Sequence, residues 1–134
     1  MTSAASRLRG KLAPALGGDA DGDAIEPFLQ VAKEFNATVI PVGRAWFMAE
    51  KARPELSWSN PDGTHPGFHR AYLCNCVFFA ALTGESPVGN PYCAVIRGEA
   101  EVNKEDAAFP QEAAWQAWQE VNQAYPKNRP LLAR

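Results

Sequence analysis

The chain has 134 residues, which is the usual size of a single domain. Its 13 Lys and Arg against 15 Asp and Glu give a net charge of −2, which argues against nucleic acid or an anionic membrane surface as a partner. Three cysteines are too few, and an odd number, for a disulfide framework, so we expect buried free thiols.

Residues 1–24 predict a disordered tail, because they are rich in Ala, Gly and Ser and contain no apolar run of the length that a signal peptide needs. From Ile25 to Asn36, apolar side chains fall on one stripe at helical spacing, with Asp23 as a candidate N-cap. Residues 127–134 predict a loose C-terminus. The folded part should therefore span residues 25–126, and nothing in the sequence indicates a localisation.

The run from Ala37 to Val42 is β-branched and uncharged, which predicts a strand buried on both faces, with Pro41 at its edge or end. A single strand leaves backbone N–H and C=O groups without partners. The only further candidate is a short apolar run from Cys93 to Ile96. We therefore expect the neighbouring strands to belong to a part that this chain does not contain.

Two helices are predicted in the middle of the chain. Arg44 to Arg53 indicates a short helix closed by Pro54. Phe68 to Leu82 is the strongest helix signal, almost uniformly apolar, and Gly84 ends it. Because a bilayer span needs ~20 apolar residues, this shorter run predicts a core helix and no membrane span.

The last helix signal runs from Asn103, a good N-cap, to Tyr125. Pro110 interrupts the pattern and should kink or restart the helix. Trp115 and Trp118 follow the helical spacing, which favours core packing over a ligand-stacking surface.

Before the central helix, the segment Asp62-Gly-Thr-His65-Pro66 places an acid and a histidine three residues apart in a tight loop. Gly63 supplies the bend, and Pro66 suits a first helical position. A catalytic imidazole needs an acceptor on one ring nitrogen to hold its tautomer, while the other nitrogen stays free to take a proton. We therefore expect an oxygen of Asp62 close to one ring nitrogen of His65, with the other nitrogen facing solvent or a cleft.

Four segments together resemble the C-terminal part of the SGNH/GDSL hydrolases, a family of ester hydrolases. They are Pro41-Val-Gly-Arg-Ala-Trp46, Asp62-Gly-Thr-His-Pro66, Ala71-Tyr-Leu and Phe79-Ala-Ala-Leu-Thr-Gly84-Glu-Ser-Pro87. The resemblance covers about residues 25–125. It implies an α/β fold, namely the C-terminal part of a three-layer α/β/α, flavodoxin-like architecture, mostly helical in this chain with one firm strand.

The same resemblance implies cleavage of an acyl or acetyl ester, with a small-molecule or carbohydrate ester as substrate and neither a cofactor nor a metal. Asp62 and His65 match the family's D-x-x-H block, which supplies the catalytic aspartate and histidine. Arg44, Trp46 and Trp58 are candidates for lining the substrate pocket, because they fall in loops or helix starts near the strand or before Asp62.

The chain departs from the family pattern at the nucleophile. The family's serine lies in a G-D-S block, whereas Gly18-Asp19 is followed here by Ala20 and Gly22-Asp23 by Ala24. Gly67 and Arg70 also stand where family members commonly carry Ser and Gly. We therefore expect the nucleophile and the oxyanion-hole donors to come from a missing N-terminal half or from a second chain.

Other interpretations remain open. A non-catalytic accessory or binding protein, or a truncated inactive product, would also lack the nucleophile. His65 and His69 have a metal-ligand spacing with Asp62 as a third ligand, although Pro66 places His65 off the helix. Alternatively, Asp62 caps the helix and both histidines are ordinary surface residues.

Overall fold

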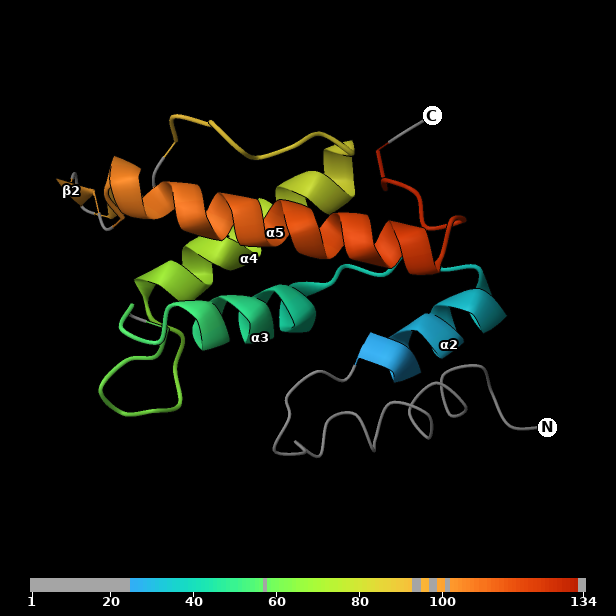
Figure 1. Cartoon of the computed structure of the whole chain (residues 1–134), viewed down its shortest axis with the longest axis horizontal. Coiled ribbons are helices and arrows are strands. Elements are labelled where there is room, and N and C mark those ends of the chain that lie inside the picture. The colour runs from blue at the N-terminus through green and yellow to red at the C-terminus, as the bar shows by residue number, and fades with distance from the viewer. Residues whose placement is uncertain (1–24, 57, 93–94, 97–98, 101, 133–134) are drawn as a thin grey trace.

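The structure is a computed structural model, and it describes residues 25–132 apart from positions 57, 93–94, 97–98 and 101. Its elements are α2 (Ile25–Phe35), α3 (Val42–Ala52), α4 (Phe68–Thr83), β1 (Val95–Ile96), β2 (Glu99–Ala100) and α5 (Lys104–Ala124) (Figure 1). The predicted tail and the candidate N-cap Asp23 lie outside the described residues.

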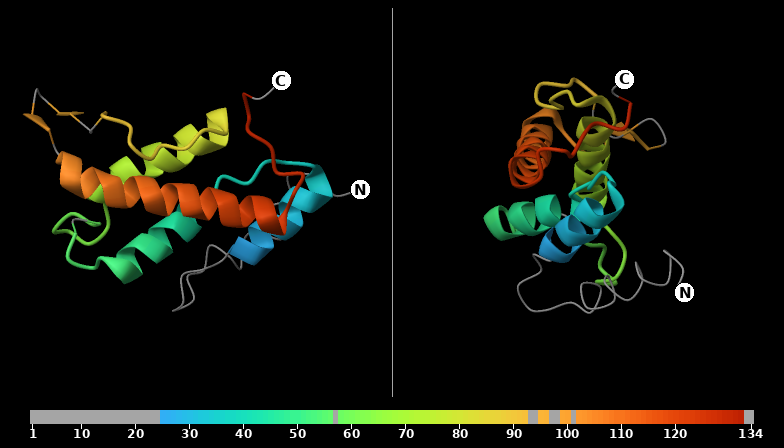
Figure 2. Two further views of the ribbon diagram at one scale, coloured as in Figure 1. Left: turned by 45° about the horizontal axis from the view of Figure 1, so that its top comes forward. Right: turned by 90° about the vertical axis from the view of Figure 1, so that its right-hand side faces the viewer.

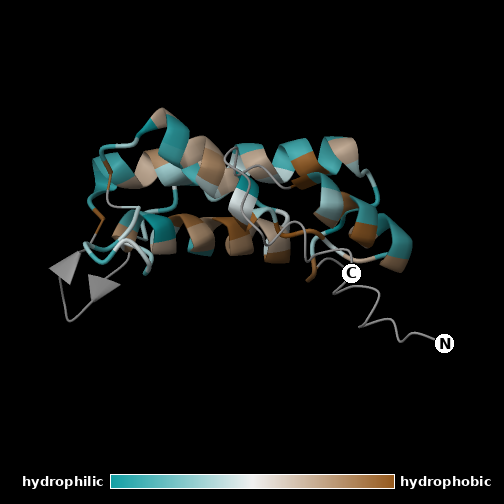
Figure 3. Cartoon of the chain, turned by 90° about the horizontal axis from the view of Figure 1, so that it is seen from below, coloured by the Kyte–Doolittle hydropathy of each residue, from teal (hydrophilic) through white to brown (hydrophobic). Residues whose placement is uncertain are grey.

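Helices α3, α4 and α5 pack against one another, and α4 and α5 make the most extensive contact (Figure 2). Small side chains at the contact let the helix axes approach closely. The main core is built from these helices and the loop before α4, and its buried members include Ala45, Ala49, Trp58, Tyr72, Leu73, Val77, Ala114 and Ala117. A second cluster joins α2 to the C-terminal end of α5 through Leu29, Ala32, Val39, Val121 and Tyr125. Hydrophobic and hydrophilic residues alternate along each helix, as expected for helices that are buried on one side (Figure 3).

The predicted α/β fold is wrong. Within the described residues the architecture is helical, and the only paired strands are the two-residue β1 and β2, which lie antiparallel with Val95 opposite Ala100. The run from Ala37 to Val42 is not a strand: residues 37–41 form an irregular connection, and Val42 already begins α3. A β-branched run becomes a strand only where another strand accepts its backbone groups, and here a side chain, Asn128, takes that role for Val39.

Local signals for the helix ends are confirmed. Asn36 has a positive φ of 52°, and the Ala37 N–H closes α2 by donating to the Ala32 carbonyl at 2.9 Å. Gly84 ends α4 with a φ of 75°. At the start of α5 the Asn103 side chain accepts the Asp106 N–H at 2.7 Å.

We expected either a kink or a restart of the helix at Pro110, and the restart does not occur, because α5 continues through this residue to Ala124. A proline inside a helix removes one backbone hydrogen bond and crowds the preceding turn. Pro110 is fully buried against the rest of the molecule. Tertiary packing therefore offsets the local cost.

Trp118 and Cys76 take core positions, whereas Trp115 and Cys74 are half-buried. Trp118 is buried and Trp115 packs beside it, as the helical spacing predicts. Cys74 and Cys76 are free thiols, and burial raises the pKa of Cys76 to about 11. Cys93 lies outside the described residues. Across the described helices, none is both long and apolar enough to cross a membrane.

The chain after α5 folds back onto α4. The N–H of Leu131 donates to the Ala81 carbonyl at 2.9 Å, and that of Leu132 donates to the Leu82 carbonyl at 2.8 Å. These bonds satisfy carbonyls that a helix C-terminus otherwise leaves open. Pro130 also lies against Gly84, where an added Cβ would meet the proline Cγ at 2.6 Å.

Candidate functional site

The loop that carries Asp62 and His65 is closed by backbone pairing at its base. Ser59 and Pro66 lie opposite each other in an antiparallel bridge, and the Gly67 N–H donates to the Trp58 carbonyl at 2.9 Å. Inside the loop, the Asn60 N–H donates to the His65 carbonyl at 2.9 Å. Gly63 takes a φ of 73° at the tip, which explains the glycine there. The loop therefore presents its side chains from a defined frame directly before α4.

The carboxylate of Asp62 organises the loop. Its Oδ1 accepts the backbone N–H of Thr64 at 2.9 Å and that of His65 at 3.0 Å. Its Oδ2 lies 2.6 Å from Nδ1 of His65. The sequence prediction that an Asp62 oxygen approaches a ring nitrogen of His65 is therefore met in the structure.

These hydrogen bonds favour the ionised form of Asp62. The backbone N–H groups of His65 and Thr64, followed by the His65 side chain, lower the pKa of Asp62 to about 2. A carboxylate that stays ionised accepts a hydrogen bond and does not donate one. It therefore favours the neutral His65 tautomer with its proton on Nδ1 and leaves Nε2 as an acceptor.

The other ring nitrogen of His65 is open to solvent. The side chain is 72% exposed. Of the described residues, only Asp62 and Thr64 bond to its ring, and the Thr64 hydroxyl lies 3.2 Å from the same Nδ1. No hydroxyl or thiol in the described chain therefore bonds to Nε2, which is where a nucleophile would give up its proton.

The three predicted pocket residues do not gather around this pair. Arg44 on α3 forms an ion pair with Glu120 of α5, with Nε 2.9 Å from the carboxylate. The centroid of the Trp46 ring lies 3.0 Å from the guanidinium carbon of Arg70. The Arg70 side chain in α4 therefore packs on Trp46 of α3. Among the described residues, no hydrogen bond, ion pair or ring contact joins Arg44 or Trp46 to Asp62 or His65.

Trp58 lies in the core, although its sequence neighbours are polar. Only 3% of its surface is exposed, and its indole N–H donates to the Arg53 carbonyl at 2.6 Å. Its ring packs edge-on against His69 and Phe109. The side chain therefore anchors the base of the Asp62–His65 loop instead of facing a substrate.

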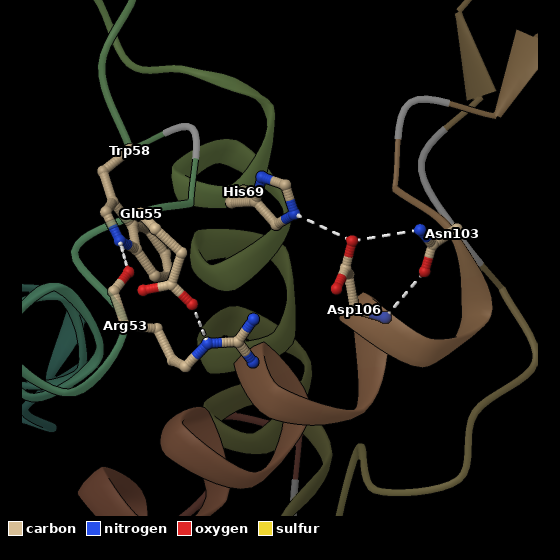
Figure 4. A network of polar contacts seen from close by, with 6 residues as sticks. All are labelled: Arg53, Glu55, Trp58, His69, Asn103 and Asp106. Atoms are coloured by element: carbon tan, nitrogen blue, oxygen red, sulfur yellow. Dashed lines mark hydrogen bonds and ion pairs between the residues drawn. The ribbon is translucent and has the colours of Figure 1, made fainter.

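A second histidine–aspartate contact connects α4 to α5 (Figure 4). Nε2 of buried His69 lies 4.0 Å from Oδ2 of Asp106, whose carboxylate also accepts from the Asn103 side chain at 3.0 Å. Burial lowers the pKa of His69, and the nearby Asp106 carboxylate opposes this shift. The two residues are 37 positions apart in the sequence, so local sequence patterns could not predict this contact.

The metal interpretation needed His65, His69 and Asp62 to converge. His65 is exposed in the loop, whereas His69 turns into the protein beside Trp58 and Asp106. The described residues contain no cluster of three or more His, Cys, Asp or Glu side chains that could hold a metal ion.

A groove of about 420 Å³ lies away from the loop that carries Asp62 and His65. It shares no residue with that loop and is lined by Asn36, Ala37, Thr38, Lys127 and Arg129.

No protein-family model, no curated protein and no solved structure matches this chain.

Proposed function

We propose that this chain supplies the histidine–aspartate part of an ester hydrolase, with the serine nucleophile and the oxyanion donors coming from another polypeptide segment. The observation that carries the proposal is the 2.6 Å contact between His65 Nδ1 and an Asp62 carboxylate that two backbone N–H groups hold ionised. The resemblance of the surrounding segments to ester hydrolases supports the same reaction class.

The reaction would use Nε2 of His65 in both half-reactions. As the serine oxygen bonds to the ester carbonyl carbon, Nε2 takes the hydroxyl proton, and Asp62 stabilises the resulting imidazolium. When the bond from carbon to the alcohol oxygen breaks, the same proton passes to the leaving alcohol. Water then repeats the sequence on the acyl-serine and releases the acid. The substrate class is a small-molecule or carbohydrate ester.

The test has two parts. For the chain alone, nitrogen-detected NMR should show the proton of the neutral His65 ring on Nδ1, and Asp62→Asn should shift the ring toward the other tautomer. A wild-type ring with its proton on Nε2 would remove the basis of the proposal.

The second part uses hydrolysis of 4-nitrophenyl acetate. The chain alone should show no enzymatic turnover, because its sequence has no Gly-Asp-Ser block and no hydroxyl or thiol of the described residues bonds to Nε2 of His65. Joined to a segment that carries a Gly-Asp-Ser serine and its Gly and Asn partners, it should gain turnover that His65→Ala abolishes and Asp62→Asn weakens less. The matched control His69→Gln, on the buried histidine, should retain activity. A reconstituted enzyme that is indifferent to His65→Ala would contradict the proposal.

Two observations favour a second candidate, a non-catalytic accessory or binding protein. The helical architecture differs from the α/β fold that the resemblance implies, and Arg70 packs on Trp46 as a structural residue. Under this alternative the Asp62–His65 contact only shapes the loop. His65→Ala would then change the loop conformation without changing any reconstituted activity.

A further inference from the structure

Helix α4 has a second apolar face that the described fold does not cover. Its inner face is buried in the core, while Phe68 and Phe78 are 43% and 45% exposed. Ala71 and Asn75 are also exposed, and Leu82 is half-buried. The exposed face therefore consists of these five residues, which we call the outer seam: Phe68, Ala71, Asn75, Phe78 and Leu82.

The spacing of the outer seam is that of a coiled-coil interface. Its members follow one another at intervals of three, four, three and four residues, so they occupy alternate a and d positions of a heptad. The positions between them, such as Leu73, Cys76 and Val77, are the ones that face the core. One helix thus carries a heptad stripe on the side opposite its own core.

The outer seam carries no ionic charge. From Ala71 to Thr83 the sequence contains no Asp, Glu, Lys or Arg. Two identical faces of this kind meet without like-charge repulsion, and the one polar member, Asn75, is self-complementary because a carboxamide both donates and accepts. A neutral face with a self-pairing amide at its centre fits a second copy of itself better than a partner recognised by charge.

We propose that α4 pairs with α4 of a second copy of this chain along the outer seam, in parallel, with Asn75 facing Asn75 across a two-fold axis. A single Asn at an a position specifies a two-stranded register at some cost in affinity. Sixteen helical residues span about 24 Å, close to two heptads. Leu131 and Leu132, which are 53% and 67% exposed, add apolar surface near the C-terminal end of α4, to which their backbone N–H groups bond. We expect a weak, concentration-dependent dimer.

The first test is sedimentation equilibrium of the full chain across a wide range of concentrations. Wild type should pass from monomer to dimer, and Phe78→Glu should weaken dimerisation at least tenfold, because it places two carboxylates at one contact. Asn75→Leu should tighten association at least tenfold. The matched control Phe28→Glu changes an exposed phenylalanine on α2 and should leave the dimer unchanged.

A second test reads the direction of pairing by oxidative cross-linking in a background lacking Cys74. In a parallel dimer, both Asn75→Cys and Phe68→Cys should form a disulfide with the same position of the second copy. An antiparallel pair would hold the two copies of position 68 far apart, so failure of Phe68→Cys to cross-link would overturn the parallel arrangement. A chain that stays monomeric at all concentrations, or a dimer indifferent to Phe78→Glu, would overturn the outer seam as the interface.

Discussion

The side-chain amide of Asn128 pairs with both backbone groups of Val39. Its Oδ1 accepts the Val39 N–H at 2.7 Å, and its Nδ2 donates to the Val39 carbonyl at 3.3 Å and to the Asn122 side chain at 2.8 Å. Asn128 is 5% exposed and Val39 7%. One asparagine thereby provides, at a single residue, the two bonds that a neighbouring strand would otherwise make.

Asn128→Ala should lower the free energy of unfolding by about 2 kcal/mol, because it leaves a buried N–H and C=O of Val39 without partners. The measurement is urea unfolding followed by circular dichroism. The control Asn122→Ala removes one acceptor of the same amide in a half-buried position and should cost about 1 kcal/mol or less. Equal losses from the two substitutions would show that the pairing with Val39 contributes nothing.

Gly84→Ala should destabilise the protein by about 1–3 kcal/mol, since it combines a left-handed backbone with a steric conflict. The residue has a φ of 75°, and the new Cβ would lie 2.6 Å from Cγ of Pro130. Gly89→Ala is the matched control, because its φ is 81° but nothing lies within 4 Å. Thermal unfolding should show the larger loss for Gly84→Ala, and adding Pro130→Ala should recover the difference. Identical losses at positions 84 and 89 would exclude a role for Pro130.

The free energy of unfolding should fall in mildly acidic solution because His69 is buried as a neutral ring. Burial lowers its folded-state pKa below the ordinary value of 6.5, so the unfolded chain binds a proton first. The contribution of neutral His69 is complete above about pH 6.5 and is lost as the pH falls through the folded-state pKa. Urea unfolding between pH 8 and pH 5 should therefore show a slope that His69→Gln reduces. An unchanged slope in His69→Gln would contradict the assignment.

Asp62 should titrate at about pH 2 when its carboxyl carbon is followed by NMR. The depressed pKa means that its hydrogen bonds to the loop are complete above about pH 4, the ordinary value, and are lost as the pH falls through 2. His65→Ala should raise the midpoint only in part, because the backbone N–H groups of residues 64 and 65 remain. A midpoint near 4 in wild type would show that the loop does not hold the carboxylate in solution.

Much of the helical structure could be predicted locally. Helix ends depend on residues a few positions apart, so Asn36, Gly84 and Asn103 indicated where α2 and α4 stop and where α5 begins. The contact between Asp62 and His65 could be predicted for the same reason, since three residues and one glycine bend suffice to close it. Their catalytic role stays a prediction.

Tertiary structure decided the rest, because the outcome depended on partners far along the chain. The run from Ala37 to Val42 has the composition of a strand. Asn128 lies 89 positions beyond Val39 and bonds to its backbone, so the segment is a connection that pairs with no described strand. The polar neighbours of Trp58 in the sequence predicted an accessible loop residue. In the structure its ring is buried against His69 of α4 and Phe109 of α5. Sequence determined the periodicity and the caps, which are short-range. Only the packed chain decided the fold class and which aromatic side chains reach solvent, because burial depends on distant residues.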